Sequence, residues 1–259
     1  MLKKKYLLLD IGNTFIKWGL LENHELIFNG VMQNTQPLST EFSHLAKEIV
    51  KDIDLILIAS VKSDDWNTRC AKIISESFSC DVDFVYSESS AFDVQNSYGD
   101  PQQLGVDRWV AMIAAYHELQ SDVMVVDLGT AITIDAVDKH GHHLGGQIIP
   151  GIQLMLRCLD KETDRIKLPN MTLDSITKCT GMLATNTDDA LVHGTFNAIC
   201  GAIERMINDL NKNNYQPKVL VTGGDARLLL DIMDESYHYR PNLVLEGLAI
   251  IAIDREKDL

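Results

Sequence analysis

Two stretches of the chain place an aspartate, a glycine and a small polar residue directly after an apolar run. Asp10 opens the first, Asp-Ile-Gly-Asn-Thr, and Lys17 lies on the apolar run that follows. Asp127 opens the second, Asp-Leu-Gly-Thr, in the middle of the chain. Each pattern predicts a strand, a tight turn and another strand. The N–H groups and hydroxyls of such a turn can hold a phosphate, while its aspartate faces the accompanying cation.

A tight hairpin alone would also account for Gly12 and Asn13, because both residue types tolerate positive φ. The recurrence of the pattern at Asp127 favours phosphate binding, since a carboxylate at a strand end lies where ligands bind α/β sheets. The P-loop sequence GxxxxGK[ST] is absent, which disfavours a P-loop kinase. One such turn in each half of the chain predicts a duplicated domain that closes on a nucleotide from both sides.

A second candidate for chemistry is the segment from Gly105 to Arg108, which opens an amphipathic helix. Asp107 could be no more than an acidic residue favoured by the dipole at a helix start. Alternatively, Asp107 accepts a hydroxyl proton while Arg108 binds an anionic group through a bidentate contact. Arg108 and the helix start should both lower the pKa of Asp107, which suits a carboxylate that orients a hydroxyl for phosphoryl transfer.

Two glycine-rich connections and a histidine cluster are less informative. Residues 145–151 and 222–225 join strands to helices, and they could either approach a ligand closely or serve only as connectors. Asp225 could cap the helix that follows. We expect His140, His142 and His143 to lie in a solvated turn, because no cysteine or carboxylate has metal-ligand spacing nearby.

Hydrophobic periodicity gives the order of the elements that position these residues. In the first half we expect strands at 5–10, 15–21, 25–32, 54–60 and 82–86, and helices at 39–51 and 65–79. A polar loop at 88–104 precedes a helix at 105–119. In the second half we expect strands at 122–127, 130–137, 142–148 and 218–222, and helices at 150–160 and 188–211 and from Asp225. Residues 161–180 should be irregular, and 242–246 should form a short strand before a C-terminal helix.

This order predicts an α/β protein of duplicated actin-like (ribonuclease H-like) domains with a nucleotide cleft between them. The first domain, with its connecting loop, should span residues 1–104, and the second should span residues 105–259.

The composition argues against nucleic-acid-binding and membrane-spanning proteins. The chain has 259 residues, is 46% hydrophobic and 23% charged, and carries a formal net charge of -14. Such an acidic surface argues against nucleic acid and anionic membranes as partners. The five cysteines contain no CxxC pair, which is typical of reduced thiols in the cytosol. No stretch approaches the roughly 20 apolar residues of a membrane span. We therefore expect a soluble cytoplasmic protein.

Taken together, these motifs resemble the type III pantothenate kinases of the acetate/sugar kinase–Hsp70–actin superfamily, over essentially the whole chain. The matching residues are Asp10–Thr14 with Lys17, Tyr98 with Pro101, Leu104 and Gly105–Arg108, Asp127–Thr130, Gly145–Gly151, Thr187 with Ala190 and Gly194, and Thr222–Asp225. Each motif is modest alone, but all of them in this order are specific.

The resemblance implies ATP-dependent phosphorylation of pantothenate to 4'-phosphopantothenate, the first step of coenzyme A synthesis. It implies that Asp107 is the catalytic aspartate. The implied ATP contacts are Asp10, Gly12, Asn13, Thr14, Lys17 and Thr130. The implied pantothenate contacts are Tyr98, Gly105, Val106, Asp107, Arg108 and Thr187, the last reaching the site from the other subunit of a homodimer.

The resemblance also implies the cofactors. ATP would come with Mg²⁺, for which Asp10 is the candidate ligand. A monovalent cation, K⁺ or NH₄⁺, would be held by Asp127. Because ATP brings several negative charges to an acidic protein, these cations and Lys17 would supply counter-charge.

Two other functions remain open on the residues alone. The chain could be a superfamily kinase acting on a sugar or an acid, although the segment from Tyr98 to Arg108 weighs against this. It could also be a regulatory or accessory protein that retains the fold. The presence of Asp10, Asp107 and Asp127 weighs against that second alternative.

Overall fold

The computed structural model describes residues 4–34, 37–49, 53–165, 167, 183–230 and 236–257. By its internal contacts the chain forms two compact units. Unit 1 comprises residues 1–92, 96–117 and 242–259, and unit 2 comprises residues 93–95 and 118–241. Most of the segment expected to be irregular, 161–180, lies outside the described residues.

The sheet of unit 1 has five strands in the order β3-β2-β1-β4-β5. The first three strands form an antiparallel meander, and β4 and β5 continue the sheet parallel to β1. The bounds are β1 (Lys5–Ile11), β2 (Phe15–Glu22), β3 (Glu25–Gln33), β4 (Leu55–Ser60) and β5 (Val82–Phe84). The five strands expected from the first half of the sequence are therefore confirmed, with small shifts at their ends.

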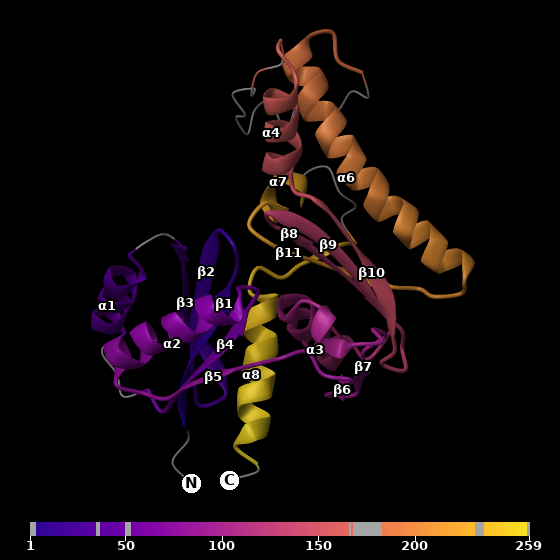
Figure 1. Cartoon of the computed structure of the whole chain (residues 1–259). Helices are drawn as coiled ribbons and strands as arrows, with labels where there is room; N and C mark the ends of the chain where they lie inside the picture. Colours follow the sequence, from indigo (N-terminus) through magenta and orange to yellow (C-terminus); the bar gives the residue numbers. More distant parts are fainter. Residues whose placement is uncertain are drawn as a thin grey trace. The chain divides into compact units, whose positions relative to one another are not determined.

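Helices cover both faces of this sheet (Figure 1). Leu7, Leu9 and Ile11 of β1 belong to a buried core with α1 (Leu38–Glu48) and α2 (Asp64–Phe78). Helix α8 (Leu243–Arg255) packs on β1, β2 and β4. Because strand side chains alternate between faces, burial of both faces explains why β1 and β4 are almost continuously apolar.

The sheet of unit 2 repeats this architecture in the order β10-β9-β8-β11-β12. Its first three strands are again antiparallel neighbours, and the last two are again parallel to the first. The bounds are β8 (Val123–Leu128), β9 (Ala131–Val137), β10 (His143–Pro150), β11 (Lys218–Thr222) and β12 (His238–Tyr239). The identical strand order confirms the expected duplication.

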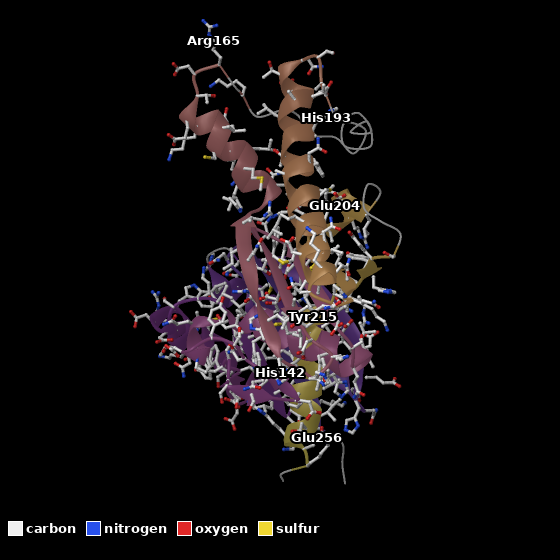
Figure 2. The ribbon with its side chains drawn as sticks, turned by 90° about the vertical axis from the view of Figure 1, so that its right-hand side faces the viewer. His142, Arg165, His193, Glu204, Tyr215 and Glu256 are labelled. Carbon is white, nitrogen blue, oxygen red and sulfur yellow. The ribbon has the colours of Figure 1, made fainter. Side chains whose placement is uncertain are left out.

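The helices among the described residues of unit 2 are α4 (Ile152–Glu162), α6 (Thr187–Lys212) and α7 (Ala226–Leu230). Phe196, Ile199 and Ile203 lie on one side of α6 and join the buried core of the sheet. Their spacing of three and four residues places them on one helical face. Figure 2 shows α6 through its labelled residues His193 and Glu204.

Between the two sheets in sequence lie short elements and one helix. The expected polar loop at 88–104 contains a two-stranded sheet of β6 (Ser90–Ala91) and β7 (Val94–Gln95) and a 3-10 turn at Pro101–Gln103. Helix α3 (Val106–Leu119) follows and is almost wholly buried.

Two expectations differ from the structure. The strand expected at 242–246 is wrong, because Asn242 precedes the first turn of α8 and the short strand lies earlier, at β12. A short apolar run cannot by its pattern be distinguished from the start of a buried helix. The expected domain boundary after residue 104 differs from the division by contacts, which groups α3 and α8 with unit 1. A Cβ on Gly247 of α8 would lie 2.2 Å from the Val110 carbonyl oxygen, so these two helices cross closely.

Within the described part of the chain, no helix combines the length and the apolar character that crossing a bilayer would require.

Candidate active site

The turn between β1 and β2 gathers the five residues expected to contact ATP in unit 1. Asp10 lies directly opposite Lys17 in the antiparallel pairing of the two strands. The Gly12 N–H donates to the Phe15 carbonyl at 3.0 Å and closes the turn. Asn13 and Thr14 at its tip are exposed. The turn thus brings a carboxylate, an ammonium group and small polar side chains to one end of the sheet.

Asn34, a residue that the sequence analysis did not single out, braces this turn. Its backbone N–H donates to the Thr14 carbonyl at 2.9 Å. Its side-chain Nδ2 donates to the Gly12 carbonyl at 2.7 Å. The register could have indicated the contact, since Phe15 pairs with Gln33 at the end of β3 and the residue that follows the strand therefore lies beside Thr14.

The turn between β8 and β9 is the counterpart in unit 2. The Gly129 N–H donates to the Ala131 carbonyl at 3.2 Å, and Thr130 is exposed. Asp127 lies opposite Thr133 of β9 and beside Thr222 of β11. The neighbours of Asp127 in register are therefore two threonines, whereas the neighbour of Asp10 on β2 is a lysine.

Gly151, the residue directly before α4, braces the second turn. Its N–H donates to the Thr130 carbonyl at 3.0 Å. A Cβ at this position would lie 2.3 Å from the Gly129 carbonyl oxygen and 2.5 Å from that of Thr130. Only glycine permits so close an approach, which gives the Gly145–Gly151 motif a packing role.

The loop after β11 also contacts the second turn. The Asp225 N–H donates to the Leu128 carbonyl at 2.9 Å. Gly223 has φ +98 and lies so close to Leu128 that a Cβ would be 2.4 Å from its carbonyl oxygen. Burial raises the pKa of the Asp225 carboxyl above its ordinary value. In unit 1 the equivalent bond runs from the Val61 N–H to the Ile11 carbonyl, at 3.2 Å.

Of the residues of unit 1 expected to bind pantothenate, Tyr98 contacts Arg108, and Asp107 contacts the backbone of Arg108. Arg108 is 6% exposed, and its Nη1 donates to the Tyr98 hydroxyl at 3.2 Å. The guanidinium carbon lies 5.9 Å from the centre of the Tyr98 ring. Asp107 is half-buried in the first turn of α3, where its Oδ1 accepts from the Arg108 N–H at 2.8 Å. Gly105 and Val106 lead into the same turn.

Thr187 belongs to unit 2, where it is the first residue of α6. It is exposed, and the side chain of Asn186 caps the helix by accepting from the Asp189 N–H at 2.9 Å. Thr187 thus lies in a different unit from the segment between Tyr98 and Arg108.

The histidine cluster differs from the expected solvated turn at one position. His142 is exposed, but the His143 side chain is buried on β10, where its Nε2 lies 3.1 Å from Oδ1 of the equally buried Asp135. The carboxylate lies on the neighbouring strand, so sequence spacing alone could not reveal the pair. Among the described residues, no group of three or more histidine, cysteine, aspartate or glutamate side chains could hold a metal ion.

Comparison with known proteins gives a family match. Residues 6–209 match the family described as "Type III pantothenate kinase". A type III pantothenate kinase of Thiobacillus denitrificans is 32% identical over 250 residues, which cover 95% of this chain and 96% of the relative. One of Azotobacter vinelandii is 32% identical over 254 residues, covering 93% of this chain and 96% of the relative.

Solved structures with little sequence similarity share the fold. The MreB5 protein of Spiroplasma citri bound to ADP has a TM-score of 0.55 at 12% identity, with 98% of each chain covered. The activator of the 2-hydroxyisocaproyl-CoA dehydratase of Clostridium difficile, with bound ADPNP, has a TM-score of 0.54 at 14% identity, covering 98% of this chain and 96% of the other. These likenesses confirm the actin-like fold expected from the sequence.

Proposed function

Because this chain belongs to the type III pantothenate kinase family, we propose that its two aspartate-glycine turns bind the phosphates of ATP and that the segment from Tyr98 to Arg108 binds pantothenate. The family reaction transfers a phosphoryl group from ATP to pantothenate, the first step of coenzyme A synthesis. Transfer of a phosphoryl group has a loose transition state, so catalysis depends mainly on positioning and on charge stabilisation.

The contact between Arg108 and Tyr98 carries the substrate assignment. A guanidinium group as buried as that of Arg108 needs acceptors, and the Tyr98 hydroxyl is one. The carboxylate of pantothenate would complement its charge through a bidentate contact. Tyr98 holds the guanidinium in place before substrate arrives, which lowers the ordering needed on binding.

Asp107 is the proposed catalytic residue. It lies next to Arg108 at the start of α3, so one turn of helix presents both groups. Its carboxylate would accept a hydrogen bond from the primary hydroxyl of pantothenate and direct that oxygen at the γ-phosphorus. The proton then leaves late, as the new bond to phosphorus forms.

The donors around the two turns fit the proposed cations. Mg²⁺ is usually held by one or two carboxylates together with substrate phosphates, and Asp10 fits that mode. K⁺ takes oxygen ligands, and Asp127 lies in register with Thr133 and Thr222. The Thr222 hydroxyl is buried, and no described residue accepts from it or donates to it. The bound cations would offset the negative charge that ATP adds to a chain of net charge -14.

We further propose a homodimer in which Thr187 contributes to the pantothenate site of the other subunit. The exposed position of Thr187 at the start of α6 leaves it available for such a contact. Sedimentation of the purified protein would test the dimer. Mixing an Asp107→Asn chain with a Thr187→Ala chain would then test shared sites, because hybrid dimers should recover activity that neither variant has alone.

The test of function is ADP release with pantothenate and MgATP, with and without K⁺. Turnover that needs pantothenate, MgATP and K⁺ together supports the proposal.

Asp107→Asn should abolish turnover while leaving MgATP binding, measured by calorimetry, largely intact. Unchanged turnover would contradict the catalytic role. Arg108→Lys should raise the KM for pantothenate about tenfold or more, since a point charge cannot replace the bidentate fork. If the protein binds MgATP but does not phosphorylate pantothenate, the result would favour the hypothesis of a regulatory or accessory protein that retains the fold.

A further inference from the structure

Asn34 makes two hydrogen bonds to the first turn, and nothing in the proposed chemistry uses it. We infer that Asn34 is a positioning residue of the nucleotide site, which fixes the direction of the backbone N–H groups offered to phosphate. The inference rests on the proposed role of the turn in binding ATP. Asn34 itself touches neither of the reacting groups in this proposal.

The planar peptide unit explains how a contact to a carbonyl can orient a donor. The Gly12 carbonyl and the Asn13 N–H belong to one plane and point in opposite directions. Because Asn34 Nδ2 donates to the Gly12 carbonyl at 2.7 Å, the Asn13 N–H is directed away from Asn34. The Gly12 N–H is already used within the turn, where it donates to Phe15.

Without this contact the peptide between Gly12 and Asn13 has freedom to rotate. A flip of this peptide changes ψ of Gly12 and φ of Asn13. Glycine is the least restricted residue and asparagine tolerates positive φ, so the flip meets little steric resistance. A flipped peptide would present a carbonyl oxygen, which repels phosphate, where the N–H should be. Asn34 therefore keeps the turn in its binding form before the nucleotide arrives, which saves the free energy of reorganisation.

The contact to Thr14 shows that the brace acts on both sides of the turn. The Asn34 backbone N–H holds the Thr14 carbonyl at 2.9 Å, while its side chain holds Gly12. A backbone contact survives substitution, but the side-chain contact does not. Removal of the side-chain amide therefore tests the orientation of the Gly12–Asn13 peptide alone, because the backbone bond that attaches the end of β3 to the turn remains.

The decisive experiment compares Asn34→Ala with Asn213→Ala. Asn213 is a matched control, because its Nδ2 also donates to a backbone carbonyl, that of Asp209, at 2.7 Å. It lies at the exposed end of α6, in unit 2. The measurements are the Kd for MgATP by calorimetry, the KM values for MgATP and pantothenate, and Tm.

Asn34→Ala should raise the Kd and the KM for MgATP roughly three- to tenfold, the range expected for one hydrogen bond, and leave the KM for pantothenate unchanged. Asn213→Ala should change Tm alone. Asn34→Asp keeps the size of the side chain, loses the donor and adds a negative charge, so it should weaken MgATP binding further. If Asn34→Ala fails to fold, Asn34→Asp tests the same side-chain contact.

An unchanged Kd for MgATP in both Asn34 variants would overturn the inference while leaving the kinase assignment intact. A wild-type protein that binds MgATP but does not phosphorylate pantothenate would overturn the proposed function alone. In that case the ratio of MgATP Kd values between wild type and Asn34→Ala still decides the role of Asn34.

Discussion

The turn after β1 and the turn after β8 occupy the same position in two sheets of identical strand order, yet different side chains surround them. In both, the N–H of the residue after the third strand donates to the turn threonine, from Asn34 to Thr14 at 2.9 Å and from Gly151 to Thr130 at 3.0 Å. The two units therefore share the same backbone hydrogen bonding around the turn.

The side chains have diverged around this common scaffold. Asp10 has Lys17 and Ala59 as its neighbours in register, whereas Asp127 has Thr133 and Thr222. An ammonium group suits phosphate oxygens, and hydroxyl oxygens suit a cation. The comparison indicates that one backbone can serve two electrostatic tasks when only the flanking residues change.

The largest effects should come from exchanging the two carboxylates for amides. Asp127→Asn should remove activation by K⁺ and lower kcat about a hundredfold or more, because a group that offsets transition-state charge contributes on this scale. Asp10→Asn should produce a similar loss and weaken the dependence on Mg²⁺ while K⁺ still activates. Initial rates over a grid of both cation concentrations would measure this.

The reciprocal pattern is what matters in that experiment. If Asp127→Asn still responds to K⁺ and Asp10→Asn does not, the cations have been assigned to the wrong turns. If each variant loses both responses, the turns act as one site and the division of tasks between them is incorrect.

Gly151→Ala should damage the second turn by sterics alone. Its added Cβ would meet two backbone carbonyls closer than 3 Å, at Gly129 and Thr130, and backbone cannot turn aside as a flexible side chain can. We expect kcat/KM for MgATP to fall about a hundredfold, as shifts of about 1 Å in an active site can cause. Steady-state kinetics at saturating pantothenate would measure the fall.

Gly201→Ala provides the control for that variant. A Cβ on Gly201 of α6 would meet no atom within 4 Å, and alanine favours a helix over glycine. Activity should be unchanged and Tm should rise slightly. Full activity in Gly151→Ala would mean that the second turn tolerates displacement and that its fit to a ligand is loose.

Lys17→Met should have an intermediate effect confined to nucleotide binding. It removes the cation opposite Asp10 and should raise the KM for MgATP about tenfold, in line with a hydrogen bond to a charged group. Its counterpart Thr133→Val should leave that KM nearly unchanged but weaken activation by K⁺. Lys72→Met, on the exposed face of α2, controls for the loss of one positive charge.

An equal rise in the KM for MgATP for Lys17→Met and Lys72→Met would show that net charge, and not the position opposite Asp10, attracts the nucleotide. Measurement at low and high ionic strength would separate the two, since a general charge effect is screened by salt.

Much of this scaffold could be predicted from sequence because its signals are local. Both hairpins combine apolar strands with a glycine turn, and the recurrence of aspartate at the same place revealed the duplication. The helix starting at Thr187 was expected one residue later, from its periodicity. The helical nature of residues 243–246 was missed because three consecutive apolar residues fit a strand as well as a buried helix.

The features that sequence could not supply depend on register and on distant contacts. Asn34 braces Gly12 across 22 positions, and its amide carries no local signature. The Arg108 guanidinium meets Tyr98 only because the intervening 3-10 turn brings the loop back to α3. The buried side chain of His143 lies 3.1 Å from that of Asp135 on the adjacent strand, a partner that the spacing of the histidines does not reveal.

The smallest effect is expected from a substitution at Asp225, in the loop between β11 and α7 that contacts the second turn. Burial raises the pKa of Asp225, so the folded state holds this proton more tightly than the unfolded state does. Stability should therefore fall as pH rises from the ordinary pKa through the raised one, and the buried charge remains unfavourable above it. Asp225→Asn should thus raise the free energy of unfolding at pH 7 by about 0.5 kcal/mol.

Urea unfolding at pH 7 and at pH 4 would measure this, and the difference between wild type and variant should shrink at the lower pH. In unit 1 the bond to the corresponding carbonyl, that of Ile11, comes from the backbone of Val61, whose side chain cannot titrate. The exposed Asp64, in the first turn of α2, is favoured by the helix dipole, so Asp64→Asn should lower stability slightly. Destabilisation by Asp225→Asn would instead mean that its carboxylate makes contacts worth more than its burial costs, and the two loops would then differ in function as well as in charge.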